Sequence, residues 1–260
     1  MRPVWTGGIS FGLIYIPVNL YTAVESVSID LDLLSKKDLS PIRYARINKS
    51  TGKEVPWKDV VKGYEYKKGD YVVLDDEDFD KIQLHRSNTI EISSFVNKKE
   101  IDPIYYEKPY YLEPDKGAEK TYYILMQALK KCGRVGIAEF IFKNREHICA
   151  ISAEDNHLQL NQMRYESEVR GLDELKLPKK VEVKEKELDL AMKLIDAMTD
   201  KFDPKDYTDD YIGALKRLIE LKKHHKTVKV KKVQPKPTDV SEIMKQLEKS
   251  LQEYSISNKR

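Results

Sequence analysis

The stretch GGISFGLIYIPVNLYTA, residues 7–23, decides how the rest of this chain is interpreted. It can be an apolar export signal behind Arg2, a serine nucleophile in a G-x-S-x-G pattern, or a strand that opens a β-barrel. Its residues alternate between two faces, with Ile9, Phe11, Leu13 and Tyr15 on one and Ser10, Gly12 and Ile14 on the other. This period of two predicts a β-strand, strongly bent at its glycines.

The export and hydrolase interpretations both lack their structural context. A signal peptide needs an unbroken apolar core of about 7–15 residues and a cleavage site of small residues, but Gly8, Gly12 and Pro17 interrupt this run. A nucleophile elbow needs a strand before the serine and a helix after it. Only nine residues precede Ser10, and a β-branched, aromatic run follows it. We therefore expect neither an export signal nor a catalytic serine.

Composition indicates a folded protein with a heavily charged surface. The chain has 260 residues, of which 40% are hydrophobic and 34% charged, enough for one large domain or two smaller ones. No run approaches the roughly 18 apolar residues of a membrane span, so we expect no membrane partner. Cys132 and Cys149 form neither a C-x-x-C pair nor a zinc pattern. We expect a reducing cytoplasm and both thiols in the core.

Short strands dominate residues 1–170. Runs rich in β-branched residues occupy 71–75, 89–96, 135–142 and 147–152, and turn signals such as Ser50-Thr51-Gly52 and Lys143-Asn144-Arg145 separate them. Two helices interrupt, one at 77–82 and one at 117–132. The second has an apolar stripe of Tyr122, Leu125, Met126 and Leu129. The fold class is therefore α+β, mainly β, and many short strands favour a closed barrel, which leaves no exposed edge.

After Pro178 the apolar residues recur at helical spacing instead of the strand-like runs of residues 1–170. Apolar stripes predict helices at 187–199 and 209–221, with Asp209 as a cap for the second. A lysine-rich linker and the hinge PKPTD, residues 235–239, precede a short terminal helix. Its apolar stripe consists of Val240, Ile243, Met244, Leu247 and Leu251.

Motifs of catalysis and cofactor binding are missing from the sequence. The acidic run at 75–80 lacks the glycine and terminal glutamate of a calcium loop, and acids at a helix start are stabilised by the helix dipole. The sequence holds no phosphate-binding P-loop, dinucleotide fingerprint or H-E-x-x-H pair. We expect no catalytic residues, metal or cofactor, and therefore a binding protein rather than an enzyme.

Positive charge is concentrated in two segments. Residues 43–68 hold eight Lys/Arg and three acids, a net charge of +5. Residues 222–236 hold seven Lys and no acid, a net charge of +7, so that with a total of +3 the remainder carries −9. An acidic body with two basic segments suits a polyanion binder. Two solvated surface faces would give the same pattern, so both interpretations stay open here.

A series of ordered blocks resembles prokaryotic Ku, the DNA-end-binding family of bacterial non-homologous end joining. The first is W-x-G-x-I-S-F-G-L-x-x-I-P-V at residues 5–18. The others are INKSTGKEVPW (47–57), VKGYEY (61–66), YVVLDDEDF (71–79), IDPIYYEKPYYLEPDKG (101–117), RVGIAEF (134–140), REH (145–147), ELDLAMKLID (187–196) and FDPKDYTDDY (202–211). Together they cover nearly the whole chain.

This resemblance implies a Ku-type β-barrel with a DNA-encircling bridge and a C-terminal helical arm. It places the barrel core at 1–178, the bridge at about 42–66, the arm at 179–225, and a basic linker with a partner-binding helix at 226–260. Two copies would form a homodimeric ring through which a double-stranded DNA end is threaded. The family is a non-enzymatic scaffold, so a nucleoid-associated protein of the cytoplasm is implied.

The resemblance also implies which residues meet each partner. The DNA-binding residues would be Arg43, Arg46, Lys49, Lys53, Lys58, Lys62, Lys222, Lys223, Lys226 and Lys229. The apolar stripe of the terminal helix would bind an ATP-dependent DNA ligase of the ligase D type. The alternative is a sequence-independent single-strand-binding barrel that stacks bases on aromatic rings. Against it, Tyr105, Tyr106, Tyr110 and Tyr111 fit strand and core positions better.

Overall fold

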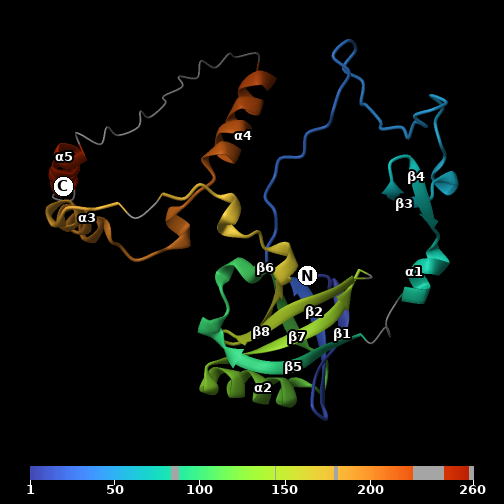
Figure 1. Ribbon diagram of the computed structural model, residues 1–260, viewed down its shortest axis with the longest axis horizontal. Helices are drawn as coiled ribbons and strands as arrows, with labels where there is room; N and C mark the ends of the chain where they lie inside the picture. Colours follow the sequence, from blue (N-terminus) through green and yellow to red (C-terminus); the bar gives the residue numbers. More distant parts are fainter. Residues whose placement is uncertain (83–87, 144, 179–180, 225–242, 258–260) are drawn as a thin grey trace. The chain divides into compact units, whose positions relative to one another are not determined.

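The computed structural model describes residues 1–82, 88–143, 145–178, 181–224 and 243–257. The chain divides into two compact units, Met1–Gly171 and Leu172–Arg260 (Figure 1). Each unit is described by itself.

The first unit is built on a closed seven-stranded barrel in the order β1-β2-β6-β9-β8-β7-β5. All neighbouring strands pair antiparallel, except β1 and β5, which close the barrel in parallel. The strands are β1 (Trp5–Phe11), β2 (Ile14–Thr22), β5 (Thr89–Asn97), β6 (Tyr106–Pro114), β7 (Arg134–Phe142), β8 (Arg145–Ala153) and β9 (Leu158–Met163). This confirms the predicted barrel.

The opening stretch forms two strands, so the expectation of one bent strand is wrong. β1 ends at Phe11, Gly12 and Leu13 form the turn, and β2 returns antiparallel from Ile14. Gly12 has φ +57°, a backbone conformation that suits the tight turn of a hairpin. Ser10 lies inside β1, opposite Tyr15, and not between a strand and a helix. The nucleophile elbow is therefore absent from this position.

Two glycines of β1 let the barrel close. A Cβ on Gly7 would lie 2.1 Å from the carbonyl oxygen of Asn88, and one on Gly8 would lie 2.3 Å from the ring of Tyr15. The amide of Gly8 donates to the same Asn88 carbonyl at 3.0 Å, beside the parallel pairing of Gly8 with Thr89. Close approach of backbone and rings is thus what requires glycine here.

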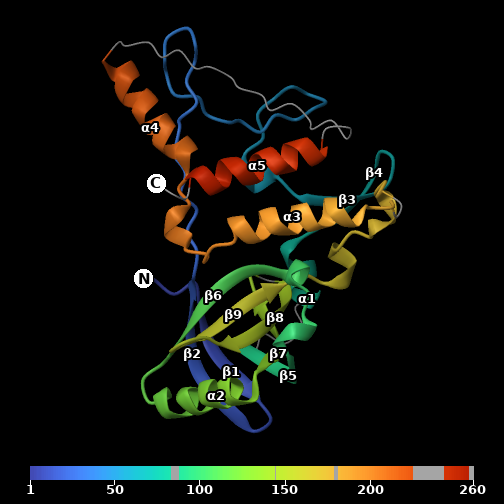
Figure 2. The same cartoon turned by 90° about the vertical axis from the view of Figure 1, so that its left-hand side faces the viewer.

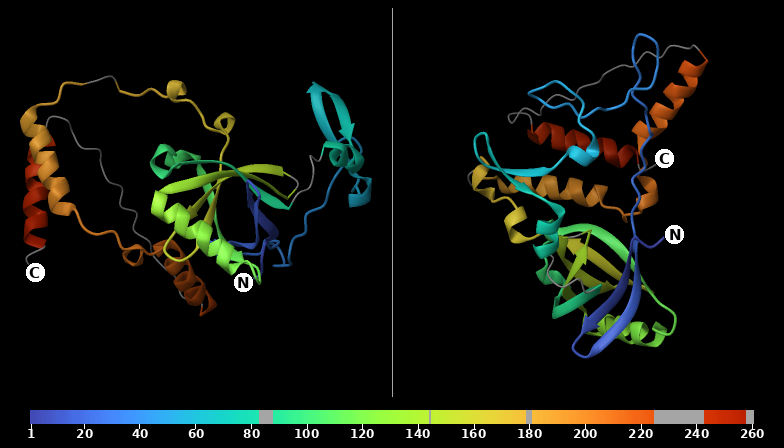
Figure 3. Two further views of the ribbon diagram at one scale, coloured as in Figure 1. Left: turned by 90° about the horizontal axis from the view of Figure 1, so that it is seen from below. Right: turned by 90° about the vertical axis from the view of Figure 1, so that its right-hand side faces the viewer.

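Helix α2 (Glu119–Cys132) packs against β7 and β8 (Figures 1 and 3). The predicted stripe is buried, and it joins the barrel core of Ile9, Ile16, Val18, Leu20, Ile90, Leu112, Phe140, Ile151, Leu158 and Leu160. The helix ends at Gly133, which adopts the left-handed conformation common at helix C-termini. Alternating inward positions, such as Ile16, Val18 and Leu20 of β2, supply this core.

Residues 24–82 of the first unit follow β2 and contain little regular structure. They hold a short 3₁₀ turn (Trp57–Asp59), the hairpin β3 (Lys62–Lys67) with β4 (Asp70–Leu74), and helix α1 (Asp76–Ile82). The structure describes all of residues 24–74, and none of them is buried. Elsewhere in the described part of the chain, 3₁₀ turns lie at Lys98–Glu100, Pro103–Tyr105 and Glu166–Glu168 in the first unit, and at Leu172–Glu174 and Pro204–Asp206 in the second.

The second unit contains α3 (Glu185–Met198), α4 (Asp210–Lys223) and α5 (Ile243–Ser257). α3 and α5 lie side by side (Figures 2 and 3). The Asp209 carboxylate accepts from the Ile212 amide at 3.0 Å, so the predicted cap is confirmed. No helix among the described residues is long and apolar enough to cross a membrane.

The two cysteines occupy different environments. Cys149 is buried in β8, where burial raises the pKa of its thiol well above the usual range. Cys132 is exposed at the end of α2, so the expectation that both thiols lie in the core is wrong for this residue. Cys132 is the last residue of α2, and Gly133 ends the helix directly after it, so the thiol lies at the end of the buried stripe.

Candidate nucleic-acid interface

The first basic segment forms a loop over residues 43–57, here named the basic loop. Its two arms run antiparallel: the amide of Val55 donates to the carbonyl of Arg46 at 2.8 Å, and Ile47 faces Glu54 across an isolated bridge. These bonds give the loop a defined backbone shape although none of its side chains is buried.

The tip of the basic loop is a turn organised by Asn48. Its carbonyl accepts from the Gly52 amide at 2.8 Å, and its amide donates to the Lys53 carbonyl at 2.9 Å. Its side-chain oxygen accepts from the amides of Ser50 (2.9 Å) and Thr51 (3.1 Å). Gly52 has φ +66°, which disfavours any residue with a Cβ. The predicted turn is therefore confirmed.

Two arginines lie at the base of the basic loop, and each has a partner. A guanidinium nitrogen of Arg43 lies 3.8 Å from a carboxylate oxygen of Glu54. The guanidinium carbon of Arg46 lies 4.5 Å from the ring centroid of Trp57. The ion pair is exposed and worth little by itself, whereas the stacked arrangement fixes the direction of the Arg46 side chain.

Three lysines of the same segment are exposed to solvent. Lys49 and Lys53 lie at the tip of the basic loop, and Lys58 lies in the 3₁₀ turn that follows it. Among the described residues, none of the three has a carboxylate within ion-pair distance. Their charge is therefore available to a polyanion.

Lys62 is placed differently from these lysines, at the start of β3. Its Nζ lies 3.8 Å from a carboxylate oxygen of Asp76 and 4.2 Å from the ring centroid of Phe79, both on α1. This side chain connects the β3–β4 hairpin to the helix that follows it. Its charge is already shared with an acidic residue, in contrast to Lys49.

The second basic set begins at the C-terminus of α4. Lys222 and Lys223 lie in the last turn, and Nζ of Lys223 is 3.4 Å from a carboxylate oxygen of Glu220. Cations at this end of a helix are stabilised by the helix dipole, so the position has a structural explanation as well. Lys226 and Lys229 lie outside the described residues. The two basic sets belong to separate units.

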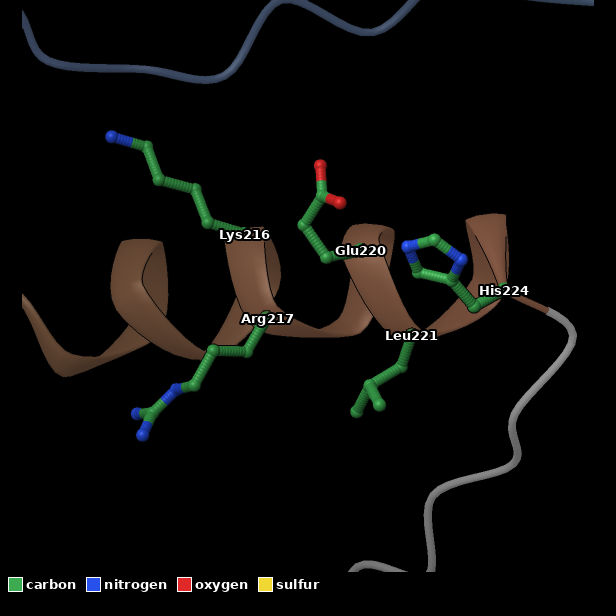
Figure 4. A pocket seen from close by; sticks show the side chains of 5 residues that line it. All are labelled: Lys216, Arg217, Glu220, Leu221 and His224. Atoms are coloured by element: carbon green, nitrogen blue, oxygen red, sulfur yellow. The ribbon is translucent and has the colours of Figure 1, made fainter.

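A shallow hollow lies on the C-terminal half of α4. It is lined by Lys216, Arg217, Glu220, Leu221 and His224 (Figure 4). Lys216 and Glu220 project from one side of the helix, and Arg217 and Leu221 project from the other (Figure 4). Since these side chains diverge, the hollow has no convergent set of polar groups for a small ligand.

Only part of the predicted partner-binding stripe can be placed. Val240 lies outside the described residues, and Ile243 and Met244 open α5 without a described side-chain environment. Leu247 and Leu251 are half-buried in α5, the helix that lies along α3. The contact shows that an intramolecular surface is available to this helix.

The described residues contain no group of three or more His, Cys, Asp or Glu side chains that could hold a metal ion. The tyrosines that the single-strand alternative would need occupy mixed positions. Tyr110 is buried and Tyr106 half-buried in β6, as expected for strand and core residues. Tyr111 of the same strand is exposed and packs edge-on against His157 with ring centroids 5.1 Å apart, and Tyr105 lies in a 3₁₀ turn, so the expectation is wrong in part for these two.

Sequence reasoning missed the residues that shape the basic loop. Trp57, Asn48 and Glu54 carry no positive charge, so a search for basic residues passes over them. Their spacing could have revealed them. Asn48 stands four residues before Gly52, which predicts a turn, and Trp57 follows at the end of the returning arm.

Comparison with known proteins assigns the chain's relatives. Residues 10–190 match the family described as Ku, the Ku70/Ku80 beta-barrel domain. This range includes the barrel from the end of β1 onward, the basic loop and the first part of α3.

Three proteins named Non-homologous end joining protein Ku are similar to this chain. The Coxiella burnetii protein is 38% identical over 265 residues, covering 99% of this chain and 97% of the relative. The Opitutus terrae protein is 39% identical over 264 residues, covering 100% and 95%. The Archaeoglobus fulgidus protein is 42% identical over 225 residues, covering 85% and 88%. The similarity thus extends across both units.

Proposed function

The chain belongs to the Ku family of non-homologous end joining proteins, and from this premise we propose that it binds the ends of double-stranded DNA. The observation that carries the proposal is similarity to proteins of that name over nearly the whole chain. The exposed basic loop supplies a chemically suitable contact, because lysines without carboxylate partners can neutralise phosphates.

We further propose that binding is independent of base sequence. Phosphate contacts fix the position of a protein on DNA, whereas base edges are read by side chains directed into a groove. The proposed contacts are basic side chains on an exposed loop and at a helix end, which suits contact with the backbone. Affinity should therefore fall steeply as salt concentration rises.

The ring is the part of the proposal that explains preference for an end. Backbone contacts alone are the same along any duplex, so they cannot distinguish an end from an interior site. A closed ring of two copies can load only where the duplex terminates. Support for a second copy comes from the large apolar surface of residues 24–74, which includes Leu31, Tyr44, Val61 and Tyr64 and is left exposed in the single chain.

In this proposal the protein acts as a scaffold and not as an enzyme. It protects the end and recruits an ATP-dependent DNA ligase of the ligase D type, which seals the break. We assign recruitment to α5, because amphipathic helices commonly dock into a partner's groove. Because α5 contacts α3 in its own chain, the ligase would either displace α3 or bind α3 and α5 together.

The first prediction concerns the requirement for an end. In a competition gel shift, linear duplex should displace a labelled linear duplex, whereas a covalently closed circle of the same sequence should not. Equal competition by the circle would mean ordinary surface binding and would exclude threading. Preferential competition by single strands would favour the alternative function, a single-strand-binding barrel.

A further inference from the structure

The basic loop is already folded in the free chain. Four hydrogen bonds organise its tip around Asn48, two through the backbone and two through the side-chain oxygen. A further bond joins the arms between Val55 and Arg46. A loop with this many internal bonds loses little conformational entropy when it meets a ligand, which favours binding by preorganisation.

Trp57 holds the base of the loop. The residue is 70% exposed, so it gains little from burial in its own chain. Its ring lies under the guanidinium of Arg46, and its carbonyl accepts from the Val60 amide at 3.1 Å within the 3₁₀ turn. An aromatic ring at this position therefore fixes one arm of the loop against the start of the next element.

The four cations of the loop fall into two classes. Arg43 and Arg46 lie at the base, where a carboxylate and an indole ring respectively engage their guanidinium groups. Lys49 and Lys53 lie on the two sides of the tip turn, and neither has a carboxylate partner among the described residues. The cations at the base therefore have partners within the loop, whereas those at the tip have no carboxylate partner among the described residues.

We propose that Lys49 and Lys53 are the phosphate-contacting residues of the basic loop, and that Trp57 and Arg46 are positioning residues that aim them. This inference rests on the proposed function, since it assigns roles within DNA binding. It assigns two different roles to basic residues for which the sequence predicted one role, DNA binding. Arg46 acts on the shape of the loop through Trp57, Arg43 is engaged by Glu54, and the two lysines act on the phosphates.

The two roles predict different salt dependence. Each phosphate neutralised contributes about 0.9 to the slope of log K against log salt. Replacing both lysines with glutamine should therefore reduce the slope by about 1.8. Loss of a positioning residue removes no phosphate contact, so it should weaken binding and leave the slope unchanged.

The experiment measures binding of the full chain to one linear duplex by fluorescence anisotropy over a series of salt concentrations. The variants are Lys49→Gln with Lys53→Gln, Arg43→Gln with Arg46→Gln, Trp57→Ala and Trp57→Phe. The lysine and arginine pairs remove the same charge from the same loop, so each serves as the control for the other. All five side chains are exposed, and none belongs to the barrel core, so the barrel should fold in every variant.

We expect the lysine pair to flatten the slope and the arginine pair to retain it. Trp57→Ala should lower affinity about two- to fivefold at every salt concentration, as expected for loss of an exposed cation–π pair. Trp57→Phe should restore most of that loss. The inference is overturned if the arginine pair flattens the slope as much as the lysine pair, or if Trp57→Ala leaves affinity unchanged.

Different results would contradict the proposed function and the division of roles in the loop. If the unaltered chain shows no salt-dependent binding to linear duplex, or binds a closed circle equally well, the assignment of DNA-end binding is at fault. If the unaltered chain binds ends and only the variants depart from expectation, the fault lies with the division of roles in the loop.

Discussion

The side chain of Tyr122 places a hydroxyl in the interior of the barrel. The oxygen donates to the Leu112 carbonyl at 2.7 Å and accepts from the Leu158 amide at 2.6 Å. Leu112 and Leu158 face one another in the register of β6 and β9. A single residue of α2 thus completes the hydrogen bonding of two strands, and burial raises the pKa of the phenol so that it stays neutral.

The second prediction tests this contact. Tyr122→Phe keeps the ring but leaves a buried carbonyl and a buried amide without a partner, so the free energy of unfolding should fall by about 1–3 kcal/mol. Chemical denaturation provides the measurement. Tyr123→Phe is the matched control, because Tyr123 is 58% exposed. Equal stability of the two variants would contradict the role given to the buried hydroxyl.

Secondary-structure elements differ in how well the sequence predicts them. Helix α2 was predicted together with its buried face, because four apolar residues recur at helical spacing and a glycine follows. The β1–β2 turn was missed, since Leu13 is apolar and continues the alternation of Ile9 and Phe11. Local pattern cannot separate one long strand from a tight hairpin when the turn residue is itself hydrophobic.

The candidate interface was predictable in part for a related reason. Net charge located the segment at 43–68, because charge is a property of composition alone. Which cation is engaged depends on the fold of the loop: Glu54 reaches Arg43, and Trp57 reaches Arg46, over sequence separations that periodicity does not encode. The lysines of the tip can be distinguished from the arginines of the base only once these contacts are known.

The role proposed for the terminal element α5 is ligase recruitment. A helix of 15 residues is marginal in water by itself, so it needs a surface, and α3 of its own chain provides one. A partner must then displace α3 or bind α3 and α5 together. In either case the apolar stripe that includes Leu247 takes part in the contact.

The third prediction concerns α5. Deletion of residues 239–260 should leave end binding and self-association nearly intact and remove stimulation of the ligase. Leu247→Asp should have the same effect, because a charge replaces a half-buried apolar group. Gln252→Asp adds the same charge at an exposed position of the helix and should be neutral.

A ligation assay beside a gel shift provides the readout for α5. Full stimulation by the truncated chain would exclude α5 as the recruitment site. Loss of end binding by the truncated chain would instead place α5 in the DNA-binding body.

The whole molecule leaves apolar surface in both units that a single copy does not cover. On α3, one face holds half-buried Leu190 and Leu194, whereas the other presents Met192 and Ile195, which are 53% and 65% exposed. A helix with apolar residues on two faces needs two neighbours. α5 is one of them, and in a homodimer the second copy would be the other.

The last prediction is that the protein is a homodimer at micromolar concentration without DNA. Sedimentation velocity should give twice the mass of the chain, and Ile195→Asp should shift the distribution toward monomer by placing a charge on the exposed apolar face. Lys193→Asp, at an exposed position of the same helix, changes the charge by two units instead of one, so it is a stringent control for negative charge and should stay dimeric. Because a ring needs two copies, the Ile195 variant should also lose its preference for linear over closed circular duplex while keeping weak, salt-sensitive binding through the basic loop. A monomer for the unaltered chain, or an Ile195 variant that still prefers ends, would separate end recognition from self-association and remove the ring from the mechanism.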